Sequence, residues 1–355
     1  MASLFHHARF QAPIATTRSV VSAVWRGVFA AIGRYAPLTK AEQRWSQGDS
    51  VVFSGDIPLR AGRFRHQRRL AFAEPRPRIE VVDNLVFTPH GASWVEGRLI
   101  ERYSACRPGL RMLAAPHNPA REIPEAYIVQ SEHIDTFGDW ISEYLSPLSH
   151  AGAIHAPVLL PQRLGGRGYV TRDAARTGLA FESVDAPVLV RRAHVVRQQR
   201  VIRYWRTEDA DALRRLLKVS AVEPRPGSLL YLSRHGEVSE VADRTYPNEA
   251  IEAIVKARGG RVLRTACAKL DDYIAAAADA ETILYDHGSA AYNMLYWHPR
   301  RAIEFVTDAW WMNAFLFFAD AVGVKDYTII RTDKPGFEER LNAALATPVA
   351  DSKGT

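Results

Sequence analysis

The chain has 355 residues, 47% of them hydrophobic, which is enough for two domains of ordinary size, each with its own core. Its Lys and Arg outnumber its Asp and Glu by 46 to 39, and the net charge of +7 is scattered along the chain. No segment combines dense basic residues with interleaved aromatic residues, so we expect no nucleic-acid partner. Only seven of the basic residues are Lys. The excess of Arg fits an anionic ligand, such as a nucleotide or a lipid surface, or a bias in codon usage.

The two cysteines, Cys106 and Cys267, predict free thiols, because neither has a Cys or His nearby at metal-ligand spacing. The first residues lack the apolar core of a signal peptide, and no run of about 18 apolar residues could span a bilayer. We therefore expect a cytoplasmic protein.

The segment from Arg18 to Tyr35 predicts an amphipathic helix. On a helical wheel its apolar residues share one sector, and its arginines and serines lie mostly opposite. The apolar sector holds Val20, Val21, Val24, Trp25, Val28, Ala31, Ile32 and Tyr35. Two interpretations stay open: the helix packs on its own domain, or it lies in the interface of an anionic membrane with its arginines toward the headgroups. The second interpretation places the protein at the inner face of a membrane.

Residues 1–78 contain this helix and a basic connecting segment, Ala41 to Arg78, and residues 79–206 predict a first α/β domain. The expected strands are Glu80–Thr88, Ser93–Ile100, Tyr127–Gln130, Pro157–Leu160, Gly168–Thr171 and Ala193–Val196. A helical run is expected from Trp140 until Pro147 ends it, and another at Arg172–Thr177. The arginine-rich stretch Arg191–Trp205 predicts an edge strand with an exposed loop, or a solvated face.

Residues 207–355 alternate regularly between helical and strand patterns, which predicts a second domain with a parallel, doubly wound sheet and C-terminal helices. The run from Thr282 to Tyr285 reads as a strand, followed by a tight turn and a helix. In that turn Gly288 lets the backbone approach a ligand, and Ser289 is placed to cap the helix. Ligands of parallel sheets gather at the carboxyl ends of the strands, where free N–H groups at a helix start suit a phosphate.

Four stretches of the second domain resemble, in order and spacing, the family 61 glycosyltransferases, which include capsular polysaccharide biosynthesis proteins. They are LLYLSR at 229–234, RTYPNE at 244–249, AADAETILYDHGSAAYNMLYW at 277–297 and AIEF at 302–305. In the first domain TFGDWISEYL at 136–145 resembles the aromatic-rich helix start of that family, with Asp139 at the position of the family's His.

The resemblance implies a GT-B architecture, in which two Rossmann-like domains face each other across a cleft. It also implies an inverting sugar transfer from a nucleotide-sugar donor to a growing or lipid-linked glycan, with no metal and no cofactor. Charge that develops on the departing diphosphate must then be met by cationic side chains and helix N-termini.

The resemblance points to a donor site at the strand ends of the second domain. The residues expected there are Arg234, Arg244, Asn248, Glu249, His287, Gly288, Ser289, Asn293 and Glu304. Arg234 and Arg244 are expected to hold the phosphates, the alternative being surface ion pairs.

For several of these residues an alternative role stays open. Asn248 contacts the ligand or caps a helix. Glu249 binds the ribose or pairs with Arg244, and Asn293 faces the ligand or a neighbouring turn. Glu304 contributes to the site or holds an arginine structurally.

An inverting transfer also needs a base, which we expect from the first domain. The candidates are Asp139 first and His133 in reserve, with Glu132 and Asp135 nearby. The alternative role for Asp139 is a helix N-cap. Two other functions remain open: a nucleotide- or glycan-binding protein without catalysis, and another nucleotide-dependent transferase. A dinucleotide oxidoreductase is disfavoured, because no GxGxxG follows an expected strand.

Overall fold

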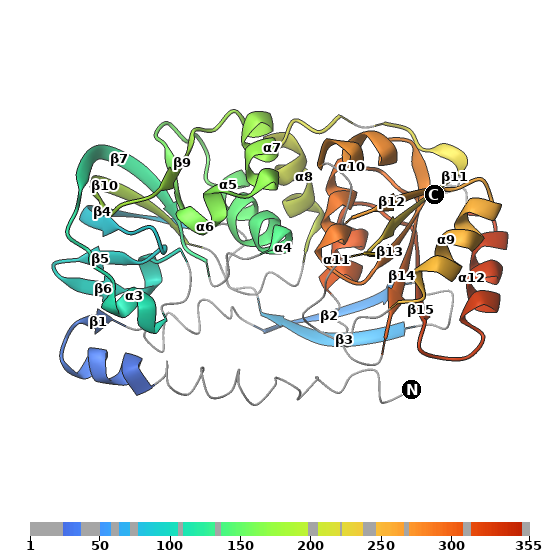
Figure 1. The fold of residues 1–355 in the computed structure, drawn as a ribbon, viewed down its shortest axis with the longest axis horizontal. Coiled ribbons are helices and arrows are strands. Elements are labelled where there is room, and N and C mark those ends of the chain that lie inside the picture. Colours follow the sequence, from blue (N-terminus) through green and yellow to red (C-terminus); the bar gives the residue numbers. More distant parts are fainter. Residues whose placement is uncertain are drawn as a thin grey trace. The chain divides into compact units, whose positions relative to one another are not determined.

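The computed structural model describes residues 24–36, 50–57, 64–71, 77–105, 109–131, 136–197, 205–220, 222–236, 246–265, 270–307 and 314–349. The chain forms two compact units, which we call the N-terminal unit, mainly Leu70–Ile202, and the C-terminal unit, mainly Arg203–Thr355. An eight-stranded sheet lies in the first and a five-stranded sheet in the second, so the fold is mixed α/β (Figure 1). Several predicted residues lie outside the described ranges: Arg18, Cys106, His133, Arg244 and Cys267.

The N-terminal unit is built on a mixed sheet with the strand order β1-β6-β5-β4-β10-β7-β8-β9. Its strands are β1 (Tyr35–Ala36), β4 (Arg78–Phe87), β5 (Ser93–Val95), β6 (Arg98–Ile100), β7 (Arg121–Val129), β8 (Val158–Pro161), β9 (Phe181–Val184) and β10 (Val188–Arg197). Its helical segments include η2 (Glu101–Tyr103), α3 (Leu110–Ala114), α4 (Phe137–Asp139), η3 (Trp140–Leu145), α5 (Ser146–Ser149), α6 (Gln162–Gly165) and α7 (Gly168–Thr177).

Three strands of this sheet, β7, β8 and β9, have the arrangement of half a Rossmann fold, and β10 lies on the other side of β7. The neighbours β9, β8, β7 and β10 are all parallel and are, in chain order, the third, second, first and fourth of the set. Strand β4 then adds antiparallel to β10. The chain therefore changes direction of winding between β7 and β10, and the carboxyl ends of these two strands form a topological switch point.

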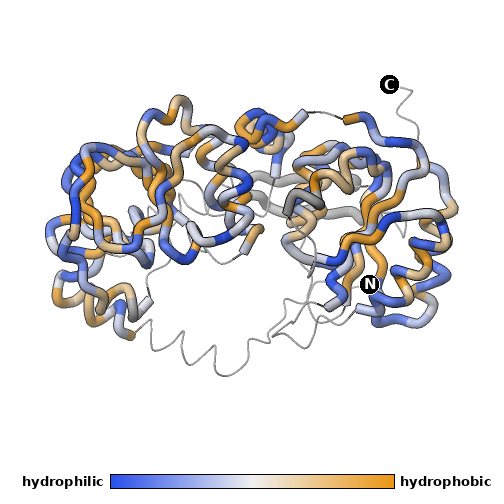
Figure 2. Tube along the Cα trace, turned by 45° about the horizontal axis from the view of Figure 1, so that its top comes forward, coloured by the Kyte–Doolittle hydropathy of each residue, from blue (hydrophilic) through white to orange (hydrophobic). Residues whose placement is uncertain are grey.

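The C-terminal unit contains a fully parallel sheet with the order β12-β11-β13-β14-β15, as the sequence predicted. Its elements are α8 (Thr207–Leu216), β11 (Arg225–Ser233), α9 (Asn248–Ala257), β12 (Arg261–Arg264), α10 (Leu270–Ala277), β13 (Ala280–Asp286), η4 (Ser289–Tyr296), β14 (Arg301–Val306), α11 (Ala314–Ala321), β15 (Asp326–Arg331) and α12 (Phe337–Ala346). Every residue of β13 and β14 is buried, as expected for parallel strands that are covered on both faces. Figure 2 shows hydrophobic residues along these central strands.

Three strand predictions in the N-terminal unit are wrong in detail. The expected strand Ser93–Ile100 is a hairpin, because Glu96 and Gly97 both have positive φ (50° and 73°) and turn the chain between β5 and β6. The expected strand Gly168–Thr171 is the first turn of α7, where burial of Val170 outweighs the β propensity of its neighbours.

The arginine-rich strand is central instead of an edge, since β10 pairs with both β4 and β7. Its arginines are accommodated by ion pairs, such as Arg191 with Glu122 at 2.6 Å on the exposed face. The helix that was expected to end at Pro147 continues to Ser149. Pro147 lies in the first turn of α5, directly after the π-helical η3, where a missing N–H is tolerated. Two further strands, β2 (Ser50–Ile57) and β3 (Phe64–Ala71), pair within the stretch that the sequence analysis treated as a connection.

The described part of the N-terminal amphipathic segment is helical at residues 24–31. It packs on the N-terminal unit through Phe29 and Ala30, which contact a core cluster that contains Trp94 and Leu99. The apolar sector of the wheel is largely exposed instead: the exposed fractions are Val24 60%, Trp25 43%, Val28 44% and Ile32 61%. The helix therefore docks on its own domain through residues outside the predicted apolar sector and leaves Val24, Trp25, Val28 and Ile32 uncovered. Among the described residues, no helix is long and apolar enough to cross a bilayer.

Candidate functional site

The C-terminal sheet has its topological switch point between β11 and β13. These two neighbours are the first and third strands of the unit in chain order, with β12 beyond one and β14 beyond the other. Ligands of open parallel sheets bind outside the carboxyl ends of the strands at such a point. There β11 leads into Arg234, and β13 ends at Asp286 and leads into His287 and Gly288.

Asp286 is a buried carboxylate that ties together three segments at this point. Its Oδ1 accepts a hydrogen bond from the Tyr231 hydroxyl at 2.7 Å. Its Oδ2 accepts from the Arg234 backbone N–H at 2.8 Å and from the Asn248 side-chain amide at 2.7 Å. The Asn248 amide also donates to the Tyr231 hydroxyl at 2.7 Å. One carboxylate thus fixes the end of β13, the turn after β11 and the first turn of α9.

Burial dominates the protonation behaviour of this group. It raises the pKa of Asp286 to about 6, although the hydrogen bonds from Arg234, Tyr231 and Asn248 act in the opposite direction. Burial, with a further contribution from the Asp286 charge, also raises the pKa of Tyr231, so the phenol stays protonated and donates.

His287 is held by a second buried group. Its Nδ1 lies 2.6 Å from Glu304 Oε1, and Tyr327 donates its hydroxyl hydrogen to Glu304 Oε2 at 2.9 Å. Both His287 and Glu304 are fully buried, and the imidazole meets the edge of Phe315. The Glu304 carboxylate accepts from Nδ1 and fixes the ring orientation. Glu304 therefore holds a histidine, not an arginine as the structural alternative proposed.

Gly288 and Arg234 approach each other closely. The Arg234 guanidinium donates from Nη1 to the His287 carbonyl at 3.3 Å. A Cβ atom at position 288 would lie 2.9 Å from the same Nη1, so any larger residue would displace the guanidinium. Glycine therefore leaves the space that the guanidinium occupies beside the turn.

The turn leads into η4, a 3-10 helix whose N-cap residue is Gly288. Ser289 is the first residue of this helix and makes no side-chain cap, so its predicted capping role is wrong. Asn293 donates its amide hydrogen to the Ala290 carbonyl at 3.0 Å, which is the neighbouring turn. Its Oδ1 is buried and has no partner among the described residues.

Two acidic residues of α9 have opposite surroundings. Glu249 has a side chain that is 90% exposed and lies 3.9 Å from His235 Nε2. Glu252 is buried and accepts from Ser233 Oγ at 2.9 Å and from Arg264 Nη2 at 2.7 Å. The Arg264 hydrogen bonds lower the pKa of Glu252 to about 2. The N-cap position of α9 is Pro247, so the predicted N-cap role of Asn248 is wrong and its amide serves Asp286 instead.

Asp139, the one candidate base within the described ranges, is the last residue of α4 and follows the end of β7 by ten positions. Thr136 caps α4, and a capping box joins it to Asp139: Thr136 Oγ1 accepts from the Asp139 N–H at 3.1 Å, and Asp139 Oδ2 accepts from the Thr136 N–H at 2.8 Å. Asp139 is thus the third residue of the helix and not its N-cap. Nearby, buried Glu143 accepts from Ser131 Oγ at 2.5 Å. Residues 132–135 lie outside the described ranges.

A family model described as Glycosyltransferase 61 matches residues 137–303. These residues form a glycosyltransferase family 61 domain. No curated protein matches it significantly. The match confirms the resemblance inferred from the motifs and identifies the protein as a glycosyltransferase.

In this glycosyltransferase the matched region runs from α4 into β14, so it contains Asp139, the Asp286 group and the turn at Gly288. The structure brings five of the predicted donor residues together: Arg234, Asn248, His287, Gly288 and Glu304.

Roles for Tyr231, Glu252, Asp286 and Tyr327 were not predicted from the sequence. Asp286 had a usable signal, because it stands at the end of a predicted strand of the parallel sheet, where ligands of such sheets gather. The others lie within ordinary strand or helix patterns, and only the packing reveals their contacts.

Proposed function

We propose that this glycosyltransferase moves a sugar from a nucleotide-sugar donor to a growing surface glycan, such as a capsule, with inversion at the anomeric carbon and without a catalytic metal ion. The observation that carries the proposal is the arrangement at the β11–β13 switch point. There the Arg234 guanidinium lies against the turn at Gly288. Buried Asp286 accepts a hydrogen bond from the Arg234 backbone N–H and so holds this segment in place.

This arrangement suits the departure of a nucleoside diphosphate. Negative charge grows on the diphosphate in the transition state, and donors that are already in position stabilise it without reorganisation. Arg234 offers a planar cation for phosphate oxygens, and the turn at Gly288 admits a ligand close to the backbone. The Asp286 hydrogen bonds hold the backbone of Arg234 in place, so Asp286 is a positioning residue in this proposal.

Acceptor activation is assigned to the N-terminal unit. Asp139 and His133 follow β7, whose carboxyl end lies at the switch point of that sheet. Asp139 is the proposed base, which takes the proton of the acceptor hydroxyl, and His133 is the alternative. The capping box uses Asp139 Oδ2 as an acceptor but does not by itself prevent proton transfer at a carboxylate, which has two oxygens.

We also propose that the enzyme works in the cytoplasm at an anionic membrane surface, close to lipid-linked acceptors. The support is the exposed apolar sector of the helix at residues 24–31, which carries Trp25 at its boundary, together with exposed Arg34 and the net positive charge of the chain. An exposed apolar face beside cationic residues fits the interface of an anionic bilayer.

The direct test is a thermal-shift screen with UDP-, GDP-, CMP- and dTDP-linked sugars, followed by transfer assays with the sugars that bind. A donor at 100 times its dissociation constant should stabilise the protein by about 2.7 kcal/mol. Adding Mg²⁺ or Mn²⁺ to chelator-treated enzyme should leave turnover unchanged. Strict dependence on either ion would refute the metal-independent mechanism, and stabilisation by none of the sugars would refute the donor site.

A further inference from the structure

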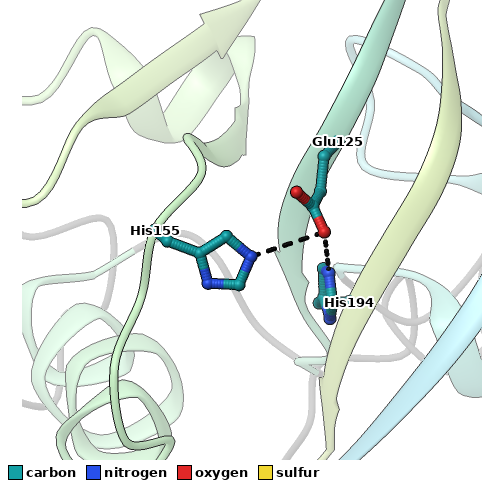
Figure 3. A group of neighbouring side chains, drawn as sticks. All are labelled: Glu125, His155 and His194. Carbon is teal, nitrogen blue, oxygen red and sulfur yellow. Dashed lines mark hydrogen bonds and ion pairs between the residues drawn. The ribbon is translucent and has the colours of Figure 1, made fainter.

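Three side chains outside the proposed transfer site converge on one point of the N-terminal unit. Glu125 comes from β7, His194 from β10, and His155 from the loop between α5 and β8 (Figure 3). Glu125 Oε1 lies 2.6 Å from His194 Nε2 and 3.4 Å from His155 Nε2. One ligand atom from each residue lies within 4.8 Å of the other two. We propose that this group binds one zinc ion.

The distances are close to those that a zinc ion requires. With zinc bonds of about 2.0–2.2 Å and tetrahedral angles, neighbouring ligand atoms are about 3.4 Å apart. The Glu125–His155 separation already has this value, and the Glu125–His194 separation must open by less than about 1 Å. Two imidazoles and one carboxylate are a ligand set that zinc accepts, whereas Mg²⁺ prefers oxygen ligands alone.

Tyr127 prepares His155 to act as a ligand. The tyrosine hydroxyl lies 3.2 Å from His155 Nδ1 and 3.3 Å from the Ala153 carbonyl. Whichever of these two atoms takes the hydroxyl hydrogen, the contact with Nδ1 holds the imidazole with Nε2 toward Glu125. The Tyr127 ring also stacks on His194, with ring centres 4.7 Å apart, which fixes the second imidazole.

The charges around the group are compatible with a cation. Glu125 supplies the one carboxylate of the group, and a glutamate side chain is ordinarily ionised near neutral pH. Arg192 is a cation beside the group, and its Nε lies 3.8 Å from Glu125 Oε1. Its side chain is 62% exposed and is free to turn toward solvent when a metal binds. The 58% exposure of His155 leaves room for water as a fourth ligand.

The position of the group indicates a structural role for the zinc ion. His155 lies in the loop that precedes β8, at the amino end of that strand, and Glu125 lies four residues before the end of β7. Ligands of the sheet, in contrast, are expected beyond the carboxyl ends. A bound zinc ion would fasten the loop at residues 150–157 to the two central strands, without taking part in sugar transfer.

The test uses untagged full-length protein that has been treated with a chelator and then freed of it. Titration calorimetry with Zn²⁺ should show one site, and Co²⁺ should give the visible absorption of a tetrahedral complex with nitrogen ligands. Zn²⁺ should raise the melting temperature, and Mg²⁺ should not. His155→Ala and Glu125→Gln should each weaken Zn²⁺ binding at least about tenfold. His155 is mostly exposed, so its replacement should not unfold the protein.

Glu122→Gln is the matched control, because Glu122 lies on the same strand as Glu125 and pairs with Arg191 on the exposed face. This variant should bind Zn²⁺ as the unmodified protein does. Equal binding by His155→Ala and the unmodified protein would overturn the proposal, since the ion would then lie at another histidine. Absence of a Zn²⁺ site would also overturn it, and the group would be a hydrogen-bonded ion pair.

Discussion

The buried carboxylate of Asp286 makes the stability of the C-terminal unit depend on pH in a way that one substitution should remove. The pKa of Asp286 is about 6 in the folded protein, against about 3.9 for an unperturbed aspartate. Between these values the folded state binds more protons than the unfolded state, so stability falls as the pH rises. A difference of about two units between the folded and unfolded pKa values corresponds to at most about 3 kcal/mol of unfolding free energy. Asp286→Asn removes the titrating group, and its amide oxygen still accepts from the Arg234 N–H and the Asn248 amide.

The measurement is urea unfolding of both proteins at several pH values from 4 to 7.5, followed by tryptophan fluorescence. The difference in unfolding free energy between the two proteins cancels the titration of every other group, including Glu252. It should shift by about 2 kcal/mol in favour of the unmodified protein as the pH falls from 7 to 4, because the unfolded aspartate is already half protonated near pH 4. Asp333→Asn, which alters a surface pair with Arg331, is the control and should shift by less than about 1 kcal/mol. A constant difference, or a shift that favours Asp286→Asn at low pH, would show that the hydrogen bonds outweigh burial and refute the reasoning.

Three further predictions concern donor binding, proton transfer and membrane association. Arg234→Ala should weaken nucleotide-sugar binding by about 1.5–3 kcal/mol, and Gly288→Ala should have a similar effect because its Cβ displaces the guanidinium; unchanged affinity in calorimetry for both variants would argue against the donor site. Asp139→Asn should keep the capping box, since the amide oxygen still accepts from the backbone, yet lower turnover about 10²-fold or more; near-normal turnover with a lower melting temperature in Asp139→Ala would leave only the capping role. The unmodified protein should float with anionic liposomes at low salt, and Trp25→Ser combined with Ile32→Ser should abolish flotation; equal flotation of the two proteins would show that the exposed apolar sector does not bind the membrane.

The sequence alone was sufficient to predict the parallel sheet of the C-terminal unit and the turn that follows Asp286. Both depend on local patterns: short apolar runs that alternate with helical periodicity, and a glycine between a strand and a helix. The family was also predicted from the sequence, because its motifs are contiguous stretches with a fixed order. In the N-terminal unit the local patterns were weaker, and β10 was taken for an edge because cross-strand partners such as Glu122 are far away in the chain.

Only the tertiary structure decided which side chains meet. Asp286 contacts Tyr231, 55 positions earlier, and Glu125 contacts His194, 69 positions later, because parallel crossovers bring the middle of one strand beside a distant one. No periodicity in the sequence encodes these distances. The protonation of Asp286 was equally beyond the sequence, since it results from burial at the end of β13 and from three donors on separate segments. Local propensity therefore determined the elements, while long-range packing determined the chemistry of the sites.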